Sequence, residues 1–292
     1  MSAADPTTAA PVIRPGRNRK RTSGAALGLL AWAAALLFFL PIAWMVLTSF
    51  HSEADAATNP PSVGASLTLD GYREFFSFGG AAGPWPALIN STTASVVSTL
   101  CVLLLALPAA YALSLRPVRK WTDVLFFFLS TKMLPLVAGL LPVYLFAKNT
   151  GLLDNVWLLV ILYTSMNLPI AVWMMRSFFL EVPGELLEAA SLDGASLWRS
   201  VREVILPLVS PGIAATALIC VIFAWNEFFL AVNLTAVNAQ TMPVYLVGFI
   251  AGEGQYWAVL SAAATMAALP VILCGWFAQN KLVRGLSFGA IK

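Results

Sequence analysis

A mixed group of acidic and basic side chains lies in one segment of this 292-residue sequence, residues 181–207. Only 11% of the whole chain is charged, yet this segment contains Glu181, Glu185, Glu188, Asp193, Arg199, Arg202 and Glu203. Two interpretations are open for such a segment. Runs of charge are usually solvated faces, but carboxylates and guanidinium groups presented on a folded loop also form ion pairs with a docked partner.

The small and apolar residues of the same segment predict two short helices joined by a bend. Leu186, Leu187 and Ala190 fall at helical spacing and form a small apolar face. Gly194 permits a sharp turn, and Ser196 has the side chain of an N-cap for a second helix. Pro207 ends the unit and begins the next apolar run. A helix–glycine–helix unit next to a membrane span has the shape of a docking element.

Four polar residues lie inside apolar segments, where they are costly: Lys132, Asn167, Asn226 and Glu227. A charge at the bilayer centre costs roughly 2.5–3.5 kcal/mol, so it usually faces a cavity or a partner. Lys132 is therefore either a residue of a translocation path or half of a buried ion pair. Asn167 hydrogen-bonds either a solute or a neighbouring helix. Asn226 and Glu227 lie near the outer end of a span, where Glu227 either lines the path or reaches the outer surface.

Other chemistry is not supported by the residues present. The sequence has no GxxxxGK[ST] loop, so the chain does not bind ATP in that way, and we expect no cofactor. His51 is the only histidine and has no neighbouring ligand with which to share a metal, so we expect no metal site. The three cysteines, Cys101, Cys220 and Cys274, fall in apolar runs and are interpreted as reduced packing residues. Nothing resembles a catalytic triad, so we do not expect an enzyme.

The elements that position these residues are predicted membrane helices. The chain is 59% hydrophobic, well above the usual composition of a soluble domain. Spans of suitable length are expected at about residues 25–47, 88–115, 122–146, 156–179, 208–232 and 256–279. Lys132 lies about ten residues into the third of these spans, which is near midplane at 1.5 Å per residue. The sequence thus predicts an all-α integral membrane protein with six spans.

The charges outside the spans predict how the chain is oriented. We expect a disordered basic tail at residues 1–24, a permease-like membrane domain at 25–280 and a second tail at 281–292. Fourteen of the 17 Lys and Arg residues fall on the face that holds both tails and the 181–207 segment, whereas Arg73 and Lys148 fall on the other. By the positive-inside rule, both termini and the 181–207 segment are cytoplasmic.

The spacing in the 181–207 segment resembles that of a known family. Glu188-Ala189-Ala190, then Gly194, then Val204 and Leu206-Pro207 resemble the EAA loop of ABC importer permeases, in which Ile is more frequent at the position of Val204. The resemblance implies the six-helix type I (MetI-like) fold. It also implies that Glu188, Ala189, Ala190, Asp193, Gly194, Leu206 and Pro207 belong to a coupling helix that seats in a groove of a cytoplasmic ATPase, where Glu188 pairs with a basic residue.

Two further segments indicate the solute. Trp225-Asn-Glu-Phe228 resembles a recurrent segment of sugar-importer permeases, and Thr131-Lys-Met-Leu-Pro135 is similar to permeases of the sorbitol/mannitol branch. As a whole the chain resembles the second membrane subunit of maltose-type systems. The resemblance implies a bacterial inner-membrane complex with a second permease, two ATPase copies and an extracytoplasmic solute-binding protein, and a mechanism of alternating access.

Alternatives remain at this point. A six-span channel or secondary transporter would work without an ATPase, although the sequence shows no inverted repeat of the kind that many secondary transporters have. An importer of amino acids, phosphate or metal oxyanions would favour a basic pore, and Lys132 is the only cation expected within a span. A neutral polyhydroxylated solute fits the sequence better.

Overall fold

The computed structural model describes residues 22–58, 62–78, 82–116, 118–250 and 256–288. The chain divides into two compact units, Met1–Trp44 and Met45–Lys292, which are described separately. The predicted N-terminal tail lies outside the described residues up to residue 21. Helix α1 (Thr22–Thr48) begins in the first unit, two residues before the predicted end of the tail, and its last four residues belong to the second unit. Most of this helix, Ala25–Thr48, is apolar enough to cross a membrane.

The second unit is built from helices throughout the part of the chain that the structure describes, without a strand. Its elements are α2 (Glu53–Ala56), α3 (Asp70–Ser77), α4 (Trp85–Leu115), α5 (Trp121–Thr131), α6 (Leu136–Thr150), α7 (Val156–Leu180), α8 (Gly184–Leu192), α9 (Leu197–Ser200), η2 (Val201–Ile205), α10 (Leu206–Trp225), α11 (Phe229–Leu234), α12 (Met242–Val247) and α13 (Trp257–Phe288). Five helices among the described residues qualify as membrane spans, and the bent pair α5–α6 makes a sixth. The predicted all-α, six-span class is confirmed.

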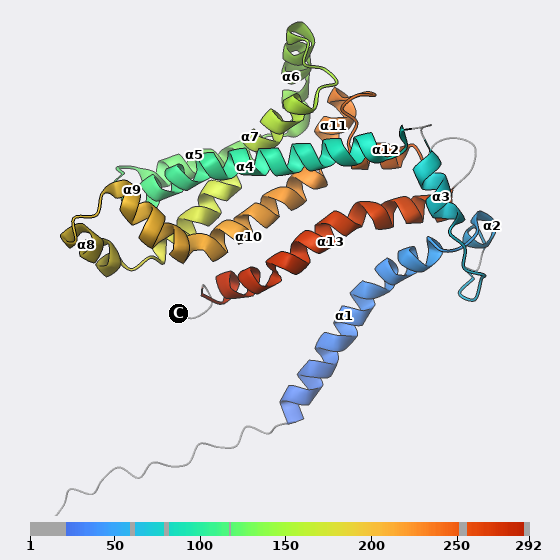
Figure 1. Ribbon diagram of the computed structural model, residues 1–292, viewed down its shortest axis with the longest axis horizontal. Coiled ribbons are helices and arrows are strands. Elements are labelled where there is room, and N and C mark those ends of the chain that lie inside the picture. The colour runs from blue at the N-terminus through green and yellow to red at the C-terminus, as the bar shows by residue number, and fades with distance from the viewer. Residues whose placement is uncertain (1–21, 59–61, 79–81, 117, 251–255, 289–292) are drawn as a thin grey trace, which may run out of the picture. The chain divides into compact units, whose positions relative to one another are not determined.

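Small residues bring the central helices together. Helix α4 packs along α7, and α10 packs against both and against α13 (Figure 1). Ala106 and Ala171 are fully buried where α4 meets α7, and Cys220 of α10 joins the same cluster. Without a hydrophobic driving force between helices in lipid, small side chains of this kind allow the close backbone approach that gives packing energy.

The third predicted span is not one helix. It is broken between Thr131 and Leu136, where α5 and α6 meet at an angle of 80° (Figure 1). Pro135 is the N-cap of α6 and has extended backbone angles. Proline lacks a backbone N–H and disfavours helical angles in the residue before it, so the break falls directly ahead of it. Lys132 consequently lies at the break rather than within a continuous helix.

The fifth span also differs from the prediction of about 208–232. Its helical path already begins at Leu197 through α9 and η2, and α10 ends at Trp225. Residues 229–234 form the separate helix α11.

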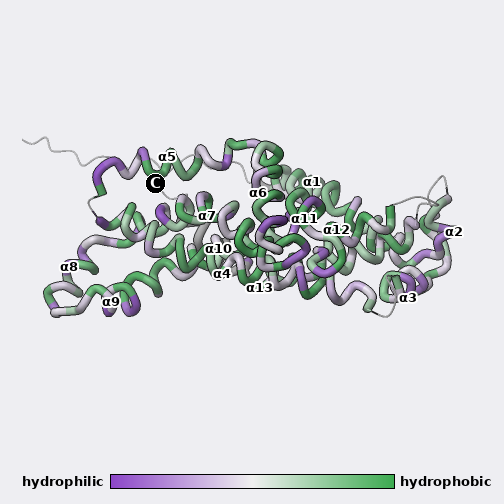
Figure 2. The backbone as a smooth tube through the Cα atoms, turned by 90° about the horizontal axis from the view of Figure 1, so that it is seen from above, coloured by the Kyte–Doolittle hydropathy of each residue, from purple (hydrophilic) through white to green (hydrophobic). Residues whose placement is uncertain are grey.

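At the C-terminus, α13 continues to Phe288, beyond the predicted boundary of the tail at residue 281, and residues 289–292 lie outside the described range. Figure 2 shows hydrophilic and hydrophobic residues mixed along α8 and α9.

Candidate functional site

The 181–207 loop folds into the two helices that its spacing predicts. Helix α8 ends with Asp193 as its C-cap, and Gly194 follows with φ of +71°. The left-handed region suits glycine because it has no Cβ to clash with the backbone. The predicted N-cap is present: the Ser196 hydroxyl accepts a hydrogen bond from the backbone N–H of Arg199 at 3.4 Å. The bend therefore results from local residue chemistry.

The loop displays an apolar surface together with its charges. Leu192 is 89% exposed, Trp198 70% and Leu197 54%. Glu188 and Ala189 are exposed as well, whereas Ala190 and Leu187 are half-buried on the side facing the spans. Among the described residues, Glu188 forms no ion pair. Exposed Leu and Trp next to a free carboxylate make this surface suited to a partner rather than to solvent.

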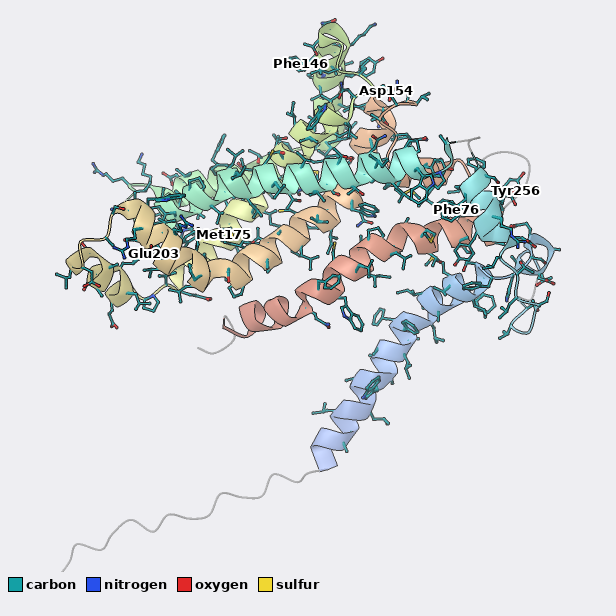
Figure 3. All side chains as sticks on the ribbon, in the orientation of Figure 1. Phe76, Phe146, Asp154, Met175, Glu203 and Tyr256 are labelled. Carbon is teal, nitrogen blue, oxygen red and sulfur yellow. The ribbon has the colours of Figure 1, made fainter. Side chains whose placement is uncertain are left out.

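One ion pair stabilises the second half of the loop. The Arg199 Nε atom lies 3.0 Å from the Glu203 Oε2 atom, one helical turn further along, and Glu203 is labelled in Figure 3. Both side chains are solvent-exposed, so the pair contributes little to stability. Its position ties α9 to η2, the turn that leads into α10.

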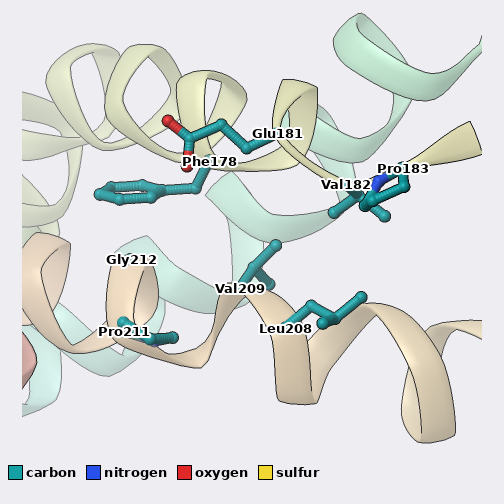
Figure 4. Close-up of a pocket in the computed structure, with 8 residues that line it drawn as sticks. All are labelled: Phe178, Glu181, Val182, Pro183, Leu208, Val209, Pro211 and Gly212. Carbon is teal, nitrogen blue, oxygen red and sulfur yellow. The ribbon is translucent and has the colours of Figure 1, made fainter. Parts of the chain in front are cut away.

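The base of the loop is fixed by buried contacts between α7 and α10. Ile205 is 1% exposed in a cluster with Met175 and Phe179, while Leu206 and Pro207 begin α10. A Cβ on Gly212 would overlap the Phe178 ring, so the ring would have to move if a larger residue stood at this position. A pocket of about 160 Å³ opens beside this contact (Figure 4). It is lined by Phe178, Glu181, Val182, Pro183, Leu208, Val209, Pro211 and Gly212.

The structure places two of the predicted path residues, Asn167 and Lys132, in different surroundings. The Asn167 Nδ2 atom donates a hydrogen bond to the Cys220 carbonyl oxygen at 3.3 Å, and Asn167 is fully buried. This contact is the interhelical alternative considered for Asn167. Lys132 is exposed within this chain, and no carboxylate among the described residues pairs with it.

Residues 225–228 alternate between anchored and exposed side chains. Trp225 Nε1 donates to the Ala267 carbonyl at 3.1 Å, which ties α10 to α13. The Glu227 carboxylate is 9% exposed and accepts hydrogen bonds from the Leu230 and Ala231 backbone N–H groups at 2.9 and 3.2 Å. Asn226 points outward, and its Nδ2 atom donates to the Ile222 carbonyl. Glu227 thus faces inward and caps α11, and does not reach the outer surface.

The structure contains a polar contact that sequence reasoning missed. Asp154, labelled in Figure 3, has φ of +55° and follows α6. Its carboxylate accepts hydrogen bonds from the backbone N–H groups of residues 236–239 and from Asn238 Nδ2. Burial acts to raise the pKa of Asp154, but the four backbone donors together outweigh it and lower the pKa to about 2. The Asp-Asn pair after Gly151 was a turn signal, but nothing in the sequence names the distant loop.

The comparisons with known proteins agree with this architecture. Residues 78–287 match the family described as binding-protein-dependent transport system inner membrane component. A probable ABC transporter permease of Sinorhizobium fredii is 37% identical over 276 residues, covering 94% of this chain and 98% of that protein. The trehalose transport system permease of Mycobacterium tuberculosis is 31% identical over 278 residues, covering 94% and 98%.

A solved structure has the same fold. It is that of a bacterial ABC transporter involved in the import of the acidic polysaccharide alginate, with a TM-score of 0.73 and 24% identity, covering 92% of this chain and all of the matched chain. The fold and the family match together define a membrane subunit of an ABC importer. The chain belongs to the family of binding-protein-dependent transport system inner membrane components, and is a multi-pass transport subunit rather than an enzyme.

Proposed function

We propose that this chain forms half of the translocation path of an ATP-driven importer for a neutral sugar or polyol. The observation that carries the proposal is the 181–207 loop, in which Glu188 has no ion-pair partner among the described residues and Leu192 and Trp198 are exposed. A surface of this composition needs a partner to cover it. Because the chain has no phosphate-binding loop of its own, the natural partner is a cytoplasmic ATPase that supplies the energy.

The family description supports the remaining partners. Two observations support the class of solute. A binding-protein-dependent system includes a solute-binding protein, and a single chain provides only one wall of a path, which favours a second, related permease. Similar permeases include one named for trehalose transport. Lys132 lies at the break between α5 and α6, about ten residues into the third predicted span, and its ammonium donates three hydrogen bonds to acceptors such as hydroxyl oxygens.

The mechanism that fits these parts is alternating access. Closure of the ATPase dimer would draw the two coupling loops together, and the central helices would carry this movement to the outer mouth. The loop is joined to the spans through α7 on one side and through η2 and α10 on the other. The buried contacts of Ile205 and the Phe178–Gly212 packing join α7 to α10 at the base of the loop.

Reconstitution tests the proposal. The chain would be purified with its co-expressed partners and placed in proteoliposomes with Mg-ATP inside and the binding protein outside. Uptake of radiolabelled trehalose, maltose, sorbitol, mannitol and phosphate would be compared. We expect ATP-dependent uptake of at least one neutral solute and none of phosphate. Uptake without ATP or an ATPase would contradict the proposal, and trehalose uptake without sorbitol or mannitol uptake would contradict its polyol part.

A further inference from the structure

Helix α5 is held to the rest of the chain by few contacts. Within α5, which the structure describes in full, Leu125 is the one buried residue. It packs with Val102 and Ala106 of α4 and with Ala171 of α7. Phe126 and Phe127 are 74% and 67% exposed, so they add no attachment within this chain. Any further contact of α5 with its neighbours therefore has a large influence on where the helix lies.

Arg176 of α7 provides that further contact. Its guanidinium carbon lies 3.8 Å from the centre of the Trp121 ring, at the first residue of α5. Its Nε atom donates a hydrogen bond to the Leu113 carbonyl at 3.1 Å, in the last turn of α4. Carbonyls in a last turn lack partners within their own helix, and a cation over an indole face is the strongest pairing of its kind. One side chain thus joins three helices.

The position of Arg176 relates this contact to the 181–207 loop. Arg176 lies four residues before α7 ends at Leu180, and α8 begins at Gly184. Helix α7 therefore moves with the loop by chain continuity. Helix α5 has no such continuity, yet it leads directly to the 80° break that holds Lys132. The Arg176–Trp121 contact is the attachment between α5 and α7 that lies nearest to the loop.

We propose that Arg176 is a positioning residue that makes α5 follow α7, so that movement of the 181–207 loop reaches the α5–α6 break. The inference rests on the proposed function, because it assumes an ATPase that moves the loop. It predicts that the contact affects the response of the break to nucleotide rather than assembly of the complex. Leu125 remains as a second anchor, so α5 stays folded against α4 and α7 when the contact is removed.

A thiol reporter at the break tests this without knowledge of the solute. Met133 is 84% exposed, so Met133→Cys would be introduced with Cys101→Ser, Cys220→Ser and Cys274→Ser in the full complex. The rate of modification by the cationic methanethiosulfonate MTSET would be measured with and without Mg-ATP and vanadate. With Arg176 present, we expect the nucleotide to change this rate by about fivefold or more, the lower range of allosteric coupling.

Arg176→Gln and Trp121→Leu remove the contact from opposite sides, and Arg116→Gln is the control. Arg176→Gln and Trp121→Leu should each reduce the response to less than about twofold, and the double variant should do no more than either one. Arg176→Lys should restore part of it, because an ammonium still pairs with the indole. Arg116→Gln removes a nearby cation that lies over Tyr111 of its own helix α4, so it should leave the response unchanged.

The outcomes separate this inference from the proposed function. An unchanged response in Arg176→Gln and Trp121→Leu would overturn the inference, as would loss of ATPase assembly in both, which would make the contact purely structural. A reporter that does not respond even with Arg176 present would also overturn it. The proposed function fails separately, if no ATPase co-purifies or uptake does not require ATP.

Discussion

The Tyr163 hydroxyl donates a hydrogen bond to the Glu227 Oε2 atom at 3.0 Å, across 64 residues of sequence. Tyr163 is 1% exposed on α7, and the Glu227 carboxylate also accepts two backbone N–H groups at the start of α11. Three donors satisfy a carboxylate that would otherwise be costly to bury. The pair thereby connects α7 to the segment that follows α10.

Removing the charge of Glu227 should destabilise the chain. In Glu227→Gln, the amide NH2 group replaces one acceptor, so one of the three donors is left without a partner. We expect a loss of about 1–3 kcal/mol in unfolding free energy. Thermal unfolding in detergent measures it, with the exposed Glu185→Gln as control. If the double variant loses as much unfolding free energy as Tyr163→Phe and Glu227→Gln lose together, the two side chains do not interact in the folded protein.

The Asp154 contact predicts a pH dependence of stability. The pKa of Asp154 is lowered from 3.8 to about 2 in the folded chain. Its stabilising contribution is therefore fully present above the unfolded value and is lost as the pH falls through the folded one. Asp154→Asn should lower the melting temperature at neutral pH, and the difference from wild type should shrink between about pH 4 and pH 2.

The control for Asp154 is a carboxylate without such donors. Asp70 forms an exposed ion pair with Arg73, and Asp70→Asn should change the melting temperature little at any pH. A difference between wild type and Asp154→Asn that stays constant down to pH 2 would show that the carboxylate charge does not hold residues 236–239.

Residue types predict the loop better than they predict these distant contacts. Gly194 and Ser196 have local roles, a left-handed turn and an N-cap, so sequence spacing was sufficient to place them. Pro135 marks where the third span breaks, but the 80° angle depends on packing outside that segment. The inward direction of Glu227 and the donors to Asp154 depend on residues 64 and more than 80 positions away, respectively. Such pairings follow from helix packing, which one sequence does not specify.

The bend at Gly194 should tolerate only residues that accept a left-handed backbone. A Cβ at this position would meet no atom within 4 Å, so the cost of substitution is backbone strain alone. Gly194→Val should cost about 1 kcal/mol or more and reduce the amount of ATPase recovered in a pull-down. Gly194→Asn is the matched control, because asparagine enters the left-handed region more readily. Equal recovery in both variants would argue against a role for the bend.

Lys132 should affect transport more than assembly. Lys132→Met keeps the chain length and removes the charge, and no described carboxylate is left unpaired by it. We expect the complex to assemble normally, with reduced uptake or an altered preference among trehalose, maltose, sorbitol and mannitol. Lys148→Met, in the last turn of α6, is a control for loss of a cation elsewhere. Lower assembly or thermal stability in Lys132→Met would instead indicate an ion pair with a partner chain.

The central claim is that the 181–207 loop couples this chain to an ATPase, and charge reversal at Glu188 tests it most directly. Glu188 and Glu185 both lie on α8, exposed and less than one helical turn apart, so Glu185→Lys is a matched control. ATP-dependent uptake in proteoliposomes would be measured for both variants at equal membrane insertion. We expect Glu188→Lys to abolish uptake and Glu185→Lys to retain most of it, and normal uptake by Glu188→Lys would show that this carboxylate does not couple the chain to an ATPase.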